Sequence, residues 1–431
     1  MIDDPVLPAA AHFTGGHAVE MLRAAVVAAG GELFDASTAH LQYRPGHDAV
    51  ASYRTTVAWG GGDPVRETLM AATTATGPPA GTLPVEAITD AGETMQVGVW
   101  RWPFDPVLHG LADAVTPAAQ RDFLADLEFG TPALRVVSFR PLIRSVVRAT
   151  ARDGRVVYVK AVPPPTTASL VRRHELLAAA GLPVPEVLAS DADRGLVALA
   201  ELGGTNLSKQ LKLPGTRLPG AARYAALFDS LAATDLTPAT MGPHATAPEG
   251  RARTGILHAR MLGTVVTGEH ERLERLTDAL QPAMVRAAAR RQPTIHGDMY
   301  SAQLMVNGAT ITGVLDVDDA GPGDPYDDPA NLLAHLLVRA LDVRRDIARL
   351  RRYARRLRTD LTSEFGFDGA ELDIVTAGAL TGLATGPFRT QSPGWPSEVA
   401  ATLALADRLV RFAGERTLRI ASSSRHRGGR H

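Results

Sequence analysis

IHGDMYSAQLMVNGATITGVLDVDDAGPGDPYDDPA, residues 295–330, is the most informative stretch of the chain. It contains seven aspartates, and each carboxylate must be solvated, hydrogen-bonded or paired with a cation if it is to stay charged. Asn307-Gly308 lies between two segments of apolar or alternating residues, which predicts an antiparallel hairpin with a two-residue turn. So many carboxylates on one short hairpin and its exit loop indicate a site for a metal-bound phosphate.

The predicted hairpin would gather three side chains at one end of its ribbon. Asp298 and Gln303 lie at or before the start of the first strand, and Asp316 lies near the end of the second. Two carboxylates and a carboxamide oxygen form a plausible hard-oxygen site for Mg²⁺. Phosphoryl transfer needs such ligands, together with a base that takes the proton of the acceptor hydroxyl.

The composition is that of an ordinary globular protein. The chain has 431 residues, of which 45% are hydrophobic and 21% charged, enough for two or three domains with a sizeable core. The 45 Lys and Arg balance 46 Asp and Glu, so no global field would attract nucleic acid or an anionic membrane. The chain has no cysteine, which excludes disulfides, thiolate nucleophiles and Cys-ligated zinc.

Nothing in the sequence predicts a membrane segment or a secretory signal. No apolar run approaches the roughly 20 residues that span a bilayer. The N-terminus has acidic residues where a signal peptide would have Lys or Arg, and the later run MLRAAVVAAGG is short and contains Arg23. We therefore expect a cytoplasmic protein with an amphipathic helix near its N-terminus.

Sequence texture divides the chain into three regions and a tail. Residues 1–128 read as helix, strands and helix, and we expect them to form an N-terminal α/β cap domain. Residues 129–204 read mainly as strands with one helix, and residues 205–420 as helices interrupted by the hairpin. Residues 421–431 are basic and are predicted to be a disordered tail.

Two segments resemble each other. QYRPGHDAVASYR and SFRPLIRSVVRAT align through Tyr43 with Phe139, Arg44 with Arg140, and the prolines that follow. The alignment suggests that the same kind of hairpin is used twice, although an aromatic residue, Arg and Pro before a strand is also common turn chemistry.

The motif HGDMYSAQ…GVLDVDDAGPGDPYDDPA resembles the signature of the aminoglycoside phosphotransferase and choline kinase superfamily. The resemblance implies an α+β, bilobal, protein-kinase-like fold, with residues 129–204 as the mainly β N-lobe and 205–420 as the helical C-lobe. The chain is closest in style to bacterial maltokinase-like sugar kinases, which also have an N-terminal cap domain. The implied activity is ATP-dependent phosphoryl transfer with Mg²⁺ as the metal.

The resemblance also assigns roles within the motif. Asp298 becomes the catalytic base, and Gln303 and Asp316 become the Mg²⁺ ligands. Gln303 departs from the Asn that the superfamily usually has, and it offers the same oxygen on a longer arm. His296 is expected to orient the loop. Asp324 and Asp328 are expected to be structural, with Asp328 as the N-cap of a helix that begins at Pro329.

The expected N-lobe supplies candidate nucleotide contacts. Lys160, in the strand RVVYVKAV, occupies the place of the phosphate-binding lysine, and Glu175, the single Glu of the next helix, is its expected ion-pair partner. Both could instead be solvated surface charges.

The loop that should cover the phosphates lacks glycine, because SFRPLIRSVV has none. Arg140 and Arg144 are therefore candidate phosphate contacts, or else exposed turn residues. Backbone groups near Glu201 and Leu202, in the link after the strand LVALA, are expected to contact adenine.

The substrate that accepts the phosphoryl group is the least determined part of the predicted function. Little room for an activation segment remains between Asp316 and Asp328, which disfavours a protein kinase. A sugar or amino sugar is the first expectation, with Gln391 and Trp395 of TGPFRTQSPGWPSE as candidate contacts. The acidic exit loop, with Asp318 as a candidate contact, keeps an aminoglycoside as the alternative. A catalytically inactive binding module is the third possibility, and oligomeric state is not predicted.

Overall fold

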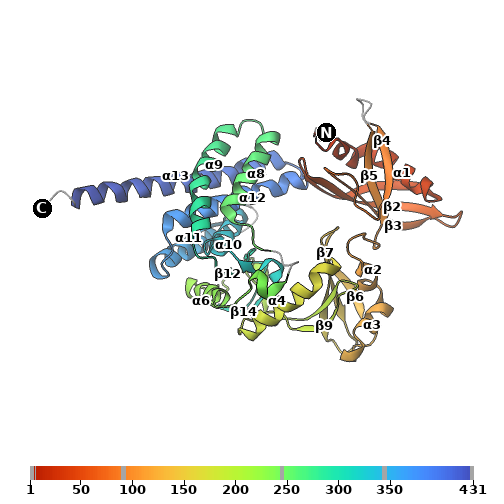
Figure 1. Ribbon diagram of the computed structural model, residues 1–431, viewed down its shortest axis with the longest axis horizontal. Helices are drawn as coiled ribbons and strands as arrows, with labels where there is room; N and C mark the ends of the chain where they lie inside the picture. The colour runs from red at the N-terminus through yellow and green to blue at the C-terminus, as the bar shows by residue number, and fades with distance from the viewer. Residues whose placement is uncertain (1–3, 5, 89–93, 243–246, 342–346, 428–431) are drawn as a thin grey trace. The chain divides into compact units, whose positions relative to one another are not determined.

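The structure, a computed structural model, describes residues 4, 6–88, 94–242, 247–341 and 347–427. The chain divides into two compact units. The first comprises residues 1–167, 188–200 and 388–393, and the second comprises residues 168–187, 201–387 and 394–431. Strands gather in the first unit and helices in the second (Figure 1), so the predicted α+β class is confirmed.

The first sheet of unit 1 is antiparallel and has the strand order β1-β2-β3-β5-β4. Its elements are η1 (Pro8–Phe13), α1 (Gly15–Ala28), β1 (Gly31–Arg44), β2 (Asp48–Trp59), β3 (Val65–Thr74), β4 (Leu83–Ile88) and β5 (Thr94–Arg101). Burial along β2 alternates over most of its length, as expected for a strand with one face on a core. The predicted N-terminal helix is α1, which buries Leu22 and Val26 on one side.

The second sheet of unit 1 has the strand order β6-β7-β8-β10-β9. Its elements are α2 (Leu111–Ala114), α3 (Pro117–Phe123), η2 (Ala125–Leu127), β6 (Ala133–Arg140), β7 (Arg144–Thr150), β8 (Val156–Ala161), β9 (Val187–Asp191) and β10 (Leu196–Ala200). Leu111 and Leu124 pack in one core cluster with Val147 and Val159 of this sheet. The helices α2 and α3, which precede residue 128, therefore pack with the second sheet, and the boundary expected at that residue stays a prediction.

The two sheets have the same topology. Counted from its own first strand, each has the order 1-2-3-5-4. The two segments that resemble each other in sequence form the first hairpin of each sheet, closed by the pairs Arg44↔Asp48 and Arg140↔Arg144. The same kind of hairpin is therefore used twice.

Unit 2 is built from helices around a short hairpin. Its elements are most of α4 (Thr167–Ala179, preceded by η3, Pro164–Thr166), β11 (Thr205–Asn206), α5 (Leu207–Gln210), α6 (Ala221–Ala232), α7 (Pro238–Met241), α8 (Arg251–Val265), α9 (His270–Ala289), β12 (Thr294–Ile295), β13 (Leu304–Asn307), β14 (Thr310–Val314), η4 (Val317–Asp319), β15 (Gly321–Pro322), α10 (Asp327–Arg339), α11 (Ile347–Glu364), α12 (Gly369–Arg389) and α13 (Trp395–Arg427). In α11 the buried residues are Leu350, Ala354, Leu357 and Leu361, a spacing of three and four residues that places them on one helix face.

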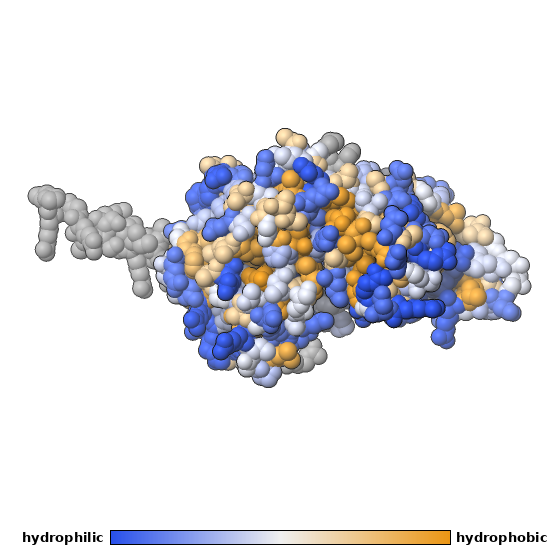
Figure 2. Space-filling model, turned by 90° about the horizontal axis from the view of Figure 1, so that it is seen from below, coloured by the Kyte–Doolittle hydropathy of each residue, from blue (hydrophilic) through white to orange (hydrophobic). Residues whose placement is uncertain are grey.

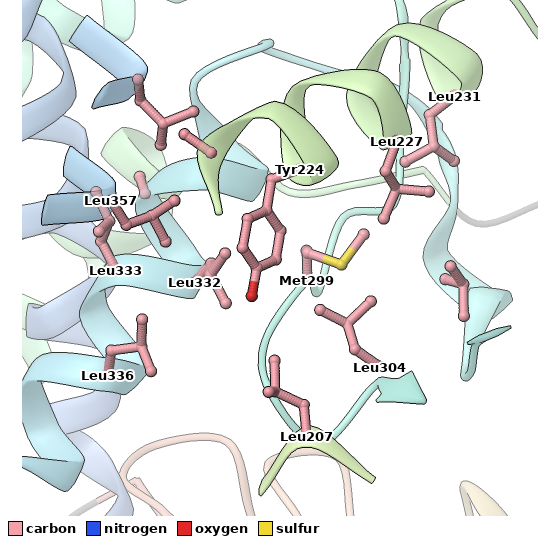
Figure 3. Packing of buried hydrophobic residues seen from close by; sticks show 14 of the residues in the cluster. Leu207, Tyr224, Leu227, Leu231, Met299, Leu304, Leu332, Leu333, Leu336 and Leu357 are labelled. Atoms are coloured by element: carbon pink, nitrogen blue, oxygen red, sulfur yellow. The ribbon is translucent and has the colours of Figure 1, made fainter. Parts of the chain in front are cut away.

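The core of unit 2 joins the hairpin to the helices around it. Met299 and Leu304 pack with Tyr224 of α6 and with Leu332 and Leu336 of α10 (Figure 3). Truncating one such leucine to alanine typically costs about 2–5 kcal/mol. This packing holds the hairpin and α10 in a fixed relation, which sets the geometry of the site described below.

The C-terminal segment differs from its prediction. The helix α13 continues to Arg427, so residues 421–427 are helical rather than disordered, and the last four residues lie outside the described part. None of the described helices is long and apolar enough to cross a membrane. Hydrophilic and hydrophobic residues are mixed on the face shown in Figure 2.

Candidate active site

The predicted hairpin is present. β13 and β14 pair antiparallel from Leu304↔Val314 to Asn307↔Thr310. The two-residue loop is Gly308-Ala309, one residue later than predicted, because Asn307 still pairs across the ladder. Gly308 has a φ of 60°, and a glycine with positive φ at the first loop position is typical of a type II′ turn.

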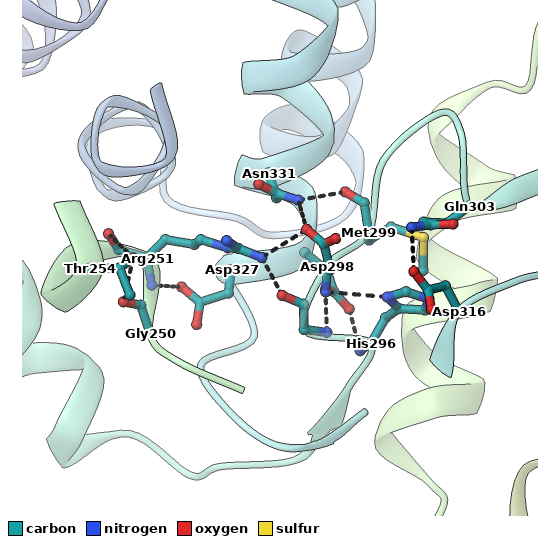
Figure 4. A network of polar contacts seen from close by, with 12 residues as sticks. Gly250, Arg251, Thr254, His296, Asp298, Met299, Gln303, Asp316, Asp327 and Asn331 are labelled. Carbon is teal, nitrogen blue, oxygen red and sulfur yellow. Dashed lines mark hydrogen bonds and ion pairs between the residues drawn. The ribbon is translucent and has the colours of Figure 1, made fainter. Parts of the chain in front are cut away.

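The hairpin brings Gln303 and Asp316 together at one end of its ribbon. The Gln303 amide donates from Nε2 to Asp316 Oδ2 at 3.1 Å (Figure 4). The backbone N–H of Leu315 donates to the Gln303 carbonyl at 2.7 Å, which fixes the two segments beside each other. Both oxygen-bearing side chains therefore lie where a shared ligand could reach them.

Asp316 has a left-handed backbone, with φ 58° and ψ 53°. Asp and Asn adopt this conformation more readily than other residues with a side chain. Asp316 lies in the turn between β14 and η4, of which it is the N-cap. Such a conformation at a polar site motivates a functional hypothesis for the residue.

Asp298 precedes the hairpin and is held through one of its two carboxylate oxygens. Oδ1 accepts a hydrogen bond from Asn331 Nδ2 at 3.1 Å and lies 3.4 Å from Arg251 Nη2 (Figure 4). No described residue donates a hydrogen bond to Oδ2, and the side chain is 42% exposed. Oδ2 is therefore available to a hydroxyl group that comes from solvent.

His296 holds the backbone around Asp298. Its ring is fully buried. Nδ1 accepts from the Asp298 N–H at 3.2 Å, and Nε2 lies 2.9 Å from the Leu315 carbonyl. Because Nδ1 accepts, the proton must be on Nε2, which can then donate to that carbonyl. The ring thus links the residue before Asp316 to the predicted base, as expected for a loop-orienting residue.

Asp328 binds the backbone of the same loop. Its carboxylate is buried and accepts the N–H of His296 at 2.7 Å and the N–H of Gly297 at 2.9 Å. The prediction that Asp328 is the N-cap is wrong, because α10 already begins at Asp327 and Tyr326 is its N-cap. Asp328 therefore holds the loop that contains His296 and Gly297, and it does not cap the helix.

Asp324 also has structural partners. It accepts two hydrogen bonds from Arg290 Nη1, at 2.8 Å and 2.6 Å, and Arg290 also pairs with Glu371. Glu371 in turn accepts from Arg286 Nε at 2.9 Å. The network ties the segment before α10 to α9 and α12, which are distant from it in sequence.

Two residues that touch Asp298 were not predicted. Arg251, the first residue of α8, also donates from Nη2 to the Gly297 carbonyl, and Asn331 also donates to the Met299 carbonyl at 3.2 Å. Arg251 lies far upstream and nothing in the sequence marks it. Asn331 had a signal, because Asp327, Asn331 and His335 recur every four residues along α10.

Asp327 is a buried carboxylate with an incomplete set of partners. Oδ1 accepts the N–H of Arg251 at 2.9 Å, and Oδ2 is buried without a hydrogen-bond partner. Burial is the main reason that its pKa is raised to about 7, and the charges of Asp324 and Asp328 act in the same direction. The α8 N-terminus opposes them but does not restore the ordinary value.

This raised pKa predicts a pH-dependent effect of Asp327→Asn. At pH values between the ordinary pKa of 3.8 and the raised pKa of about 7, Asp327 takes up a proton when the chain folds. The free energy of unfolding of the wild type therefore falls as pH rises through this range. The amide keeps the acceptor for Arg251 and cannot ionise. The variant should gain about 2–3 kcal/mol relative to wild type between pH 5 and pH 8. Urea unfolding at both pH values measures this, and an equal difference at both would contradict it.

Tyr300 and His335 form an aromatic pair near the predicted base. Their rings stack with centroids 4.1 Å apart and an interplanar angle of 18°. Burial lowers the pKa of His335 to about 4, although the nearby charge of Asp298 opposes the shift. The imidazole is therefore neutral near pH 7, and the surroundings of Asp298 include uncharged ring surface.

Lys160 and Glu175 lie in different units. Lys160 is 4% exposed and lies on the central strand β8, opposite Val146 and Val197. Glu175 has a half-exposed side chain and forms an ion pair with Arg172 at 3.6 Å on α4. The expected pair between Lys160 and Glu175 therefore stays a prediction, and Glu175 has a different partner within its own unit.

The other predicted nucleotide contacts lie at a hairpin tip and in the link between the units. Arg140 and Arg144 close the β6–β7 hairpin. In its loop Leu142, with φ 63°, adopts the left-handed conformation that a glycine would otherwise supply. The chain passes from unit 1 to unit 2 between Ala200 and Glu201. Adenine contact by Glu201 and Leu202 stays a prediction.

Asp318 lies beside a buried arginine. Arg173 of α4 donates from Nε to the Ala320 carbonyl at 2.8 Å and from Nη1 to the Asp318 carbonyl. Burial lowers the pKa of Arg173, while the charges of Asp318 and Asp319 oppose this shift. The acidic exit loop therefore has a cation within its own unit.

Gln391 and Trp395 fall in different units. Gln391 Nε2 donates to the Phe388 carbonyl at 2.7 Å, so this amide caps the end of its own helix, α12. Gln391 groups with unit 1 and Trp395, the first residue of α13, with unit 2. Their part in acceptor binding stays a prediction.

A metal ion fits the Gln303 and Asp316 pair. Mg²⁺ is usually held by one or two protein oxygens together with phosphate and water. Asp316 supplies a carboxylate, and turning the Gln303 amide would present Oε1 to the same point. In the described part of the chain no group of three or more His, Asp or Glu side chains could hold a metal.

Comparison with known proteins identifies the family. The family model described as "Phosphotransferase enzyme family" matches residues 142–364, more than half of the chain. The chain belongs to this family. It is therefore a small-molecule kinase that uses a nucleotide as phosphoryl donor, and an inactive binding module is disfavoured. The predicted aminoglycoside phosphotransferase type of fold is confirmed, and the likeness to maltokinases in particular stays a prediction.

Solved structures with a similar chain include three small-molecule kinases. An aminoglycoside phosphotransferase in complex with GDP and kanamycin is 15% identical, with 68% of this chain and 99% of that chain covered and a TM-score of 0.49. A macrolide 2′-phosphotransferase from Brachybacterium faecium is 19% identical (66% and 97% covered, TM-score 0.43). A choline/ethanolamine kinase family protein from Mesorhizobium loti is 18% identical (68% and 93% covered, TM-score 0.46). No curated protein matches the chain.

Proposed function

We propose that the protein transfers the γ-phosphate of ATP to a hydroxyl of a sugar or amino sugar, with Asp298 as the base. The observation that supports this most directly is the asymmetry of the Asp298 carboxylate. Asn331 and Arg251 hold Oδ1, while Oδ2 is left for a ligand. A carboxylate held in this way is oriented without losing the oxygen that must accept a proton.

The reaction then proceeds by proton transfer and displacement. The acceptor hydroxyl donates its hydrogen bond to Asp298 Oδ2, and the proton passes to this oxygen as the hydroxyl oxygen bonds to the γ-phosphorus. The bond between that phosphorus and the bridging oxygen of ADP breaks. His296 and Asp328 keep the loop in place during this step, because they bind its backbone rather than the reacting groups.

The remaining roles concern the nucleotide. Gln303 and Asp316 would hold Mg²⁺, which neutralises charge on the phosphates when bound. Lys160 would contact the phosphates, and backbone groups near Glu201 and Leu202 the adenine.

The surroundings of Asp298 favour an acceptor that is not strongly cationic. The side chains that lie near the carboxylate are Arg251, Asn331 and the stacked pair Tyr300 and His335. Neutral rings and amides suit a polyhydroxy compound, because sugar rings pack on aromatic faces and bond to amides. A guanidinium beside the base would repel an acceptor that carries several positive charges.

An aminoglycoside is the second candidate, and the acidic exit loop is the observation that favours it. Asp318 and Asp319 could pair with amino groups. The charge of Arg173, which acts on both carboxylates, offsets part of that attraction. We therefore rank the aminoglycoside below the sugar.

The salt dependence of acceptor binding separates these candidates. With a panel of sugars, amino sugars and aminoglycosides, we expect ADP release with a sugar or amino sugar. Its KM should change less than about twofold between low and high salt, because screening acts on charges. Steady-state kinetics at two ionic strengths measures this. Turnover confined to aminoglycosides, with a KM that rises steeply with salt, would contradict the sugar assignment.

A further inference from the structure

The tips of the two repeated hairpins have the same conformation. Each loop has three residues and begins with proline after Arg44 or Arg140. The middle residue has a left-handed backbone in both, with φ 65° at Gly46 and 63° at Leu142. In both, the N–H of the third loop residue donates to the arginine carbonyl, at 3.0 Å and 3.1 Å. The two arginines therefore have equivalent places at the two tips.

An aspartate fixes each tip in the same way. Asp4 Oδ2 accepts the N–H of Gly46 at 2.7 Å, and Asp105 Oδ2 accepts the N–H of Leu142 at 3.0 Å. Both aspartates begin the sequence Asp-Pro-Val-Leu. The Oδ1 atom of each accepts the N–H groups two and three residues later, at 3.0–3.1 Å. Each loop is therefore held by two contacts, the hydrogen bond to the arginine carbonyl and the hydrogen bond to the aspartate.

A third arginine joins these two within unit 1. The rings of Tyr43 and Phe388 lie 5.7 Å apart, which brings the next residues, Arg44 and Arg389, into the same neighbourhood. Burial is the main cause of a lowered pKa at Arg389, and the positive charges of Arg44 and Arg140 add to it. The Nε atom of Arg389 is buried without a hydrogen-bond partner.

Little negative charge lies close to Arg389. Among the described residues, Asp48 is the one acidic group whose charge opposes the lowered pKa of Arg389. Its carboxylate is already bound by Arg44, through Nε at 2.8 Å and through Nη2. The carboxylates of Asp4 and Asp105 also lie at the two tips, where they accept backbone N–H groups. Arg44 and Arg140 lie on fixed loops, and Arg389 is partly desolvated with an unused Nε donor. Such a cluster does not by itself stabilise the fold, because like charges repel and an unpaired buried donor costs free energy.

We infer that Arg44, Arg140 and Arg389 form a binding site for a phosphate group. Guanidinium groups match phosphate in geometry and supply several charge-assisted hydrogen bonds. A phosphate oxygen would accept the unused Nε donor of Arg389, and its negative charge would offset the repulsion that Arg44 and Arg140 exert on Arg389. Arg140 is already a candidate contact for the phosphates of the nucleotide, and the site adds Arg44 from the first hairpin tip and Arg389 from the end of α12. It does not depend on proton transfer at Asp298. The phosphate could belong to a nucleotide or to a separate phosphorylated ligand.

Thermal unfolding of the full-length protein with inorganic phosphate tests the site. At constant ionic strength and without nucleotide, phosphate should raise the Tm of the wild type saturably. Arg389→Gln and Arg44→Gln should each need about tenfold more phosphate for the same rise, as expected for loss of a charged hydrogen bond. Each variant is compared with its own phosphate-free Tm, so a change in basal stability does not affect the result. Arg54→Gln, at an exposed position of β2, is the matched control.

Asp48→Asn gives a test in the opposite direction. Removing the carboxylate that Arg44 binds should make phosphate bind more tightly than in the wild type. Asp298→Asn should respond to phosphate like the wild type, so failure of the proposed transfer reaction would leave the site intact.

Two arms identify the source of the phosphate group. If a nucleotide occupies the site, saturating Mg²⁺ and a non-hydrolysable ATP analogue should abolish the effect of inorganic phosphate. If a separate ligand occupies it, the effect should persist. A wild-type Tm that does not respond to phosphate, or arginine variants that respond like the wild type, would overturn the site.

Discussion

Asp298→Asn should lower kcat by on the order of 10²–10⁴-fold, the usual contribution of a positioned general base. The substitution keeps Oδ1 as an acceptor for Asn331 and leaves Arg251 with an oxygen to contact. It removes only the ability of the other side-chain atom to take a proton. The prediction is therefore specific to proton transfer, because the loop and its braces keep all their hydrogen bonds.

Steady-state and binding measurements together check this prediction. The loss should be in kcat, while the affinity for ATP should stay within about twofold of the wild type, because the base does not bind the nucleotide. Asp278→Asn, an exposed aspartate on α9, should behave like the wild type in both. Wild-type turnover in Asp298→Asn would show that another group accepts the proton.

The central hairpin was predictable because the information for it is local. Alternating apolar residues on both sides of Asn307-Gly308 define two strands and a turn, and an antiparallel ribbon returns its ends to one place. Gln303 and Asp316 meet for this reason. The turn lies one residue later than predicted, since Gly308 rather than Asn307 has the positive φ.

The residues that the sequence did not reveal come from distant segments. Arg251 is 47 residues from Asp298, and Arg173 is 147 residues from the carbonyl of Ala320 that it binds. A single arginine at a helix start has no local pattern, and its role depends on which helix end the fold brings near. Asn331 was visible in principle, as part of a polar series on α10.

The packing of α2 and α3 was not predicted, for a similar reason. The helices α2 and α3 follow the first sheet in sequence but bury Leu111 and Leu124 against the second. Periodicity shows that a helix has an apolar face and does not show which sheet receives it. The same limit applies to Asp328, whose position before proline fits an N-cap, while its carboxylate binds the loop that contains His296.

The second large effect is expected at Asp316, where charge and backbone can be separated. Asp316→Ala places an ordinary residue at φ 58° and so combines strain with loss of the carboxylate. Asp316→Asn keeps a side chain that tolerates this conformation and removes only the charge. We expect the Asn variant to fold with a Tm close to the wild type, since the amide oxygen and the local turn remain.

Activity should nonetheless fall in both Asp316 variants if the carboxylate holds Mg²⁺. kcat/KM should drop by more than about 10²-fold, and more Mg²⁺ should be needed for half-maximal activity, because a neutral amide is a weaker ligand than a carboxylate. Gln303→Asn should retain part of the activity, since its oxygen donor is preserved on a shorter arm, whereas Gln303→Ala should shift the Mg²⁺ requirement further. A Mg²⁺ titration of the four variants distinguishes these roles. If Gln303→Ala follows the wild-type curve while Asp316→Asn does not, Asp316 alone is the metal ligand and the contact between the two side chains serves only to orient it.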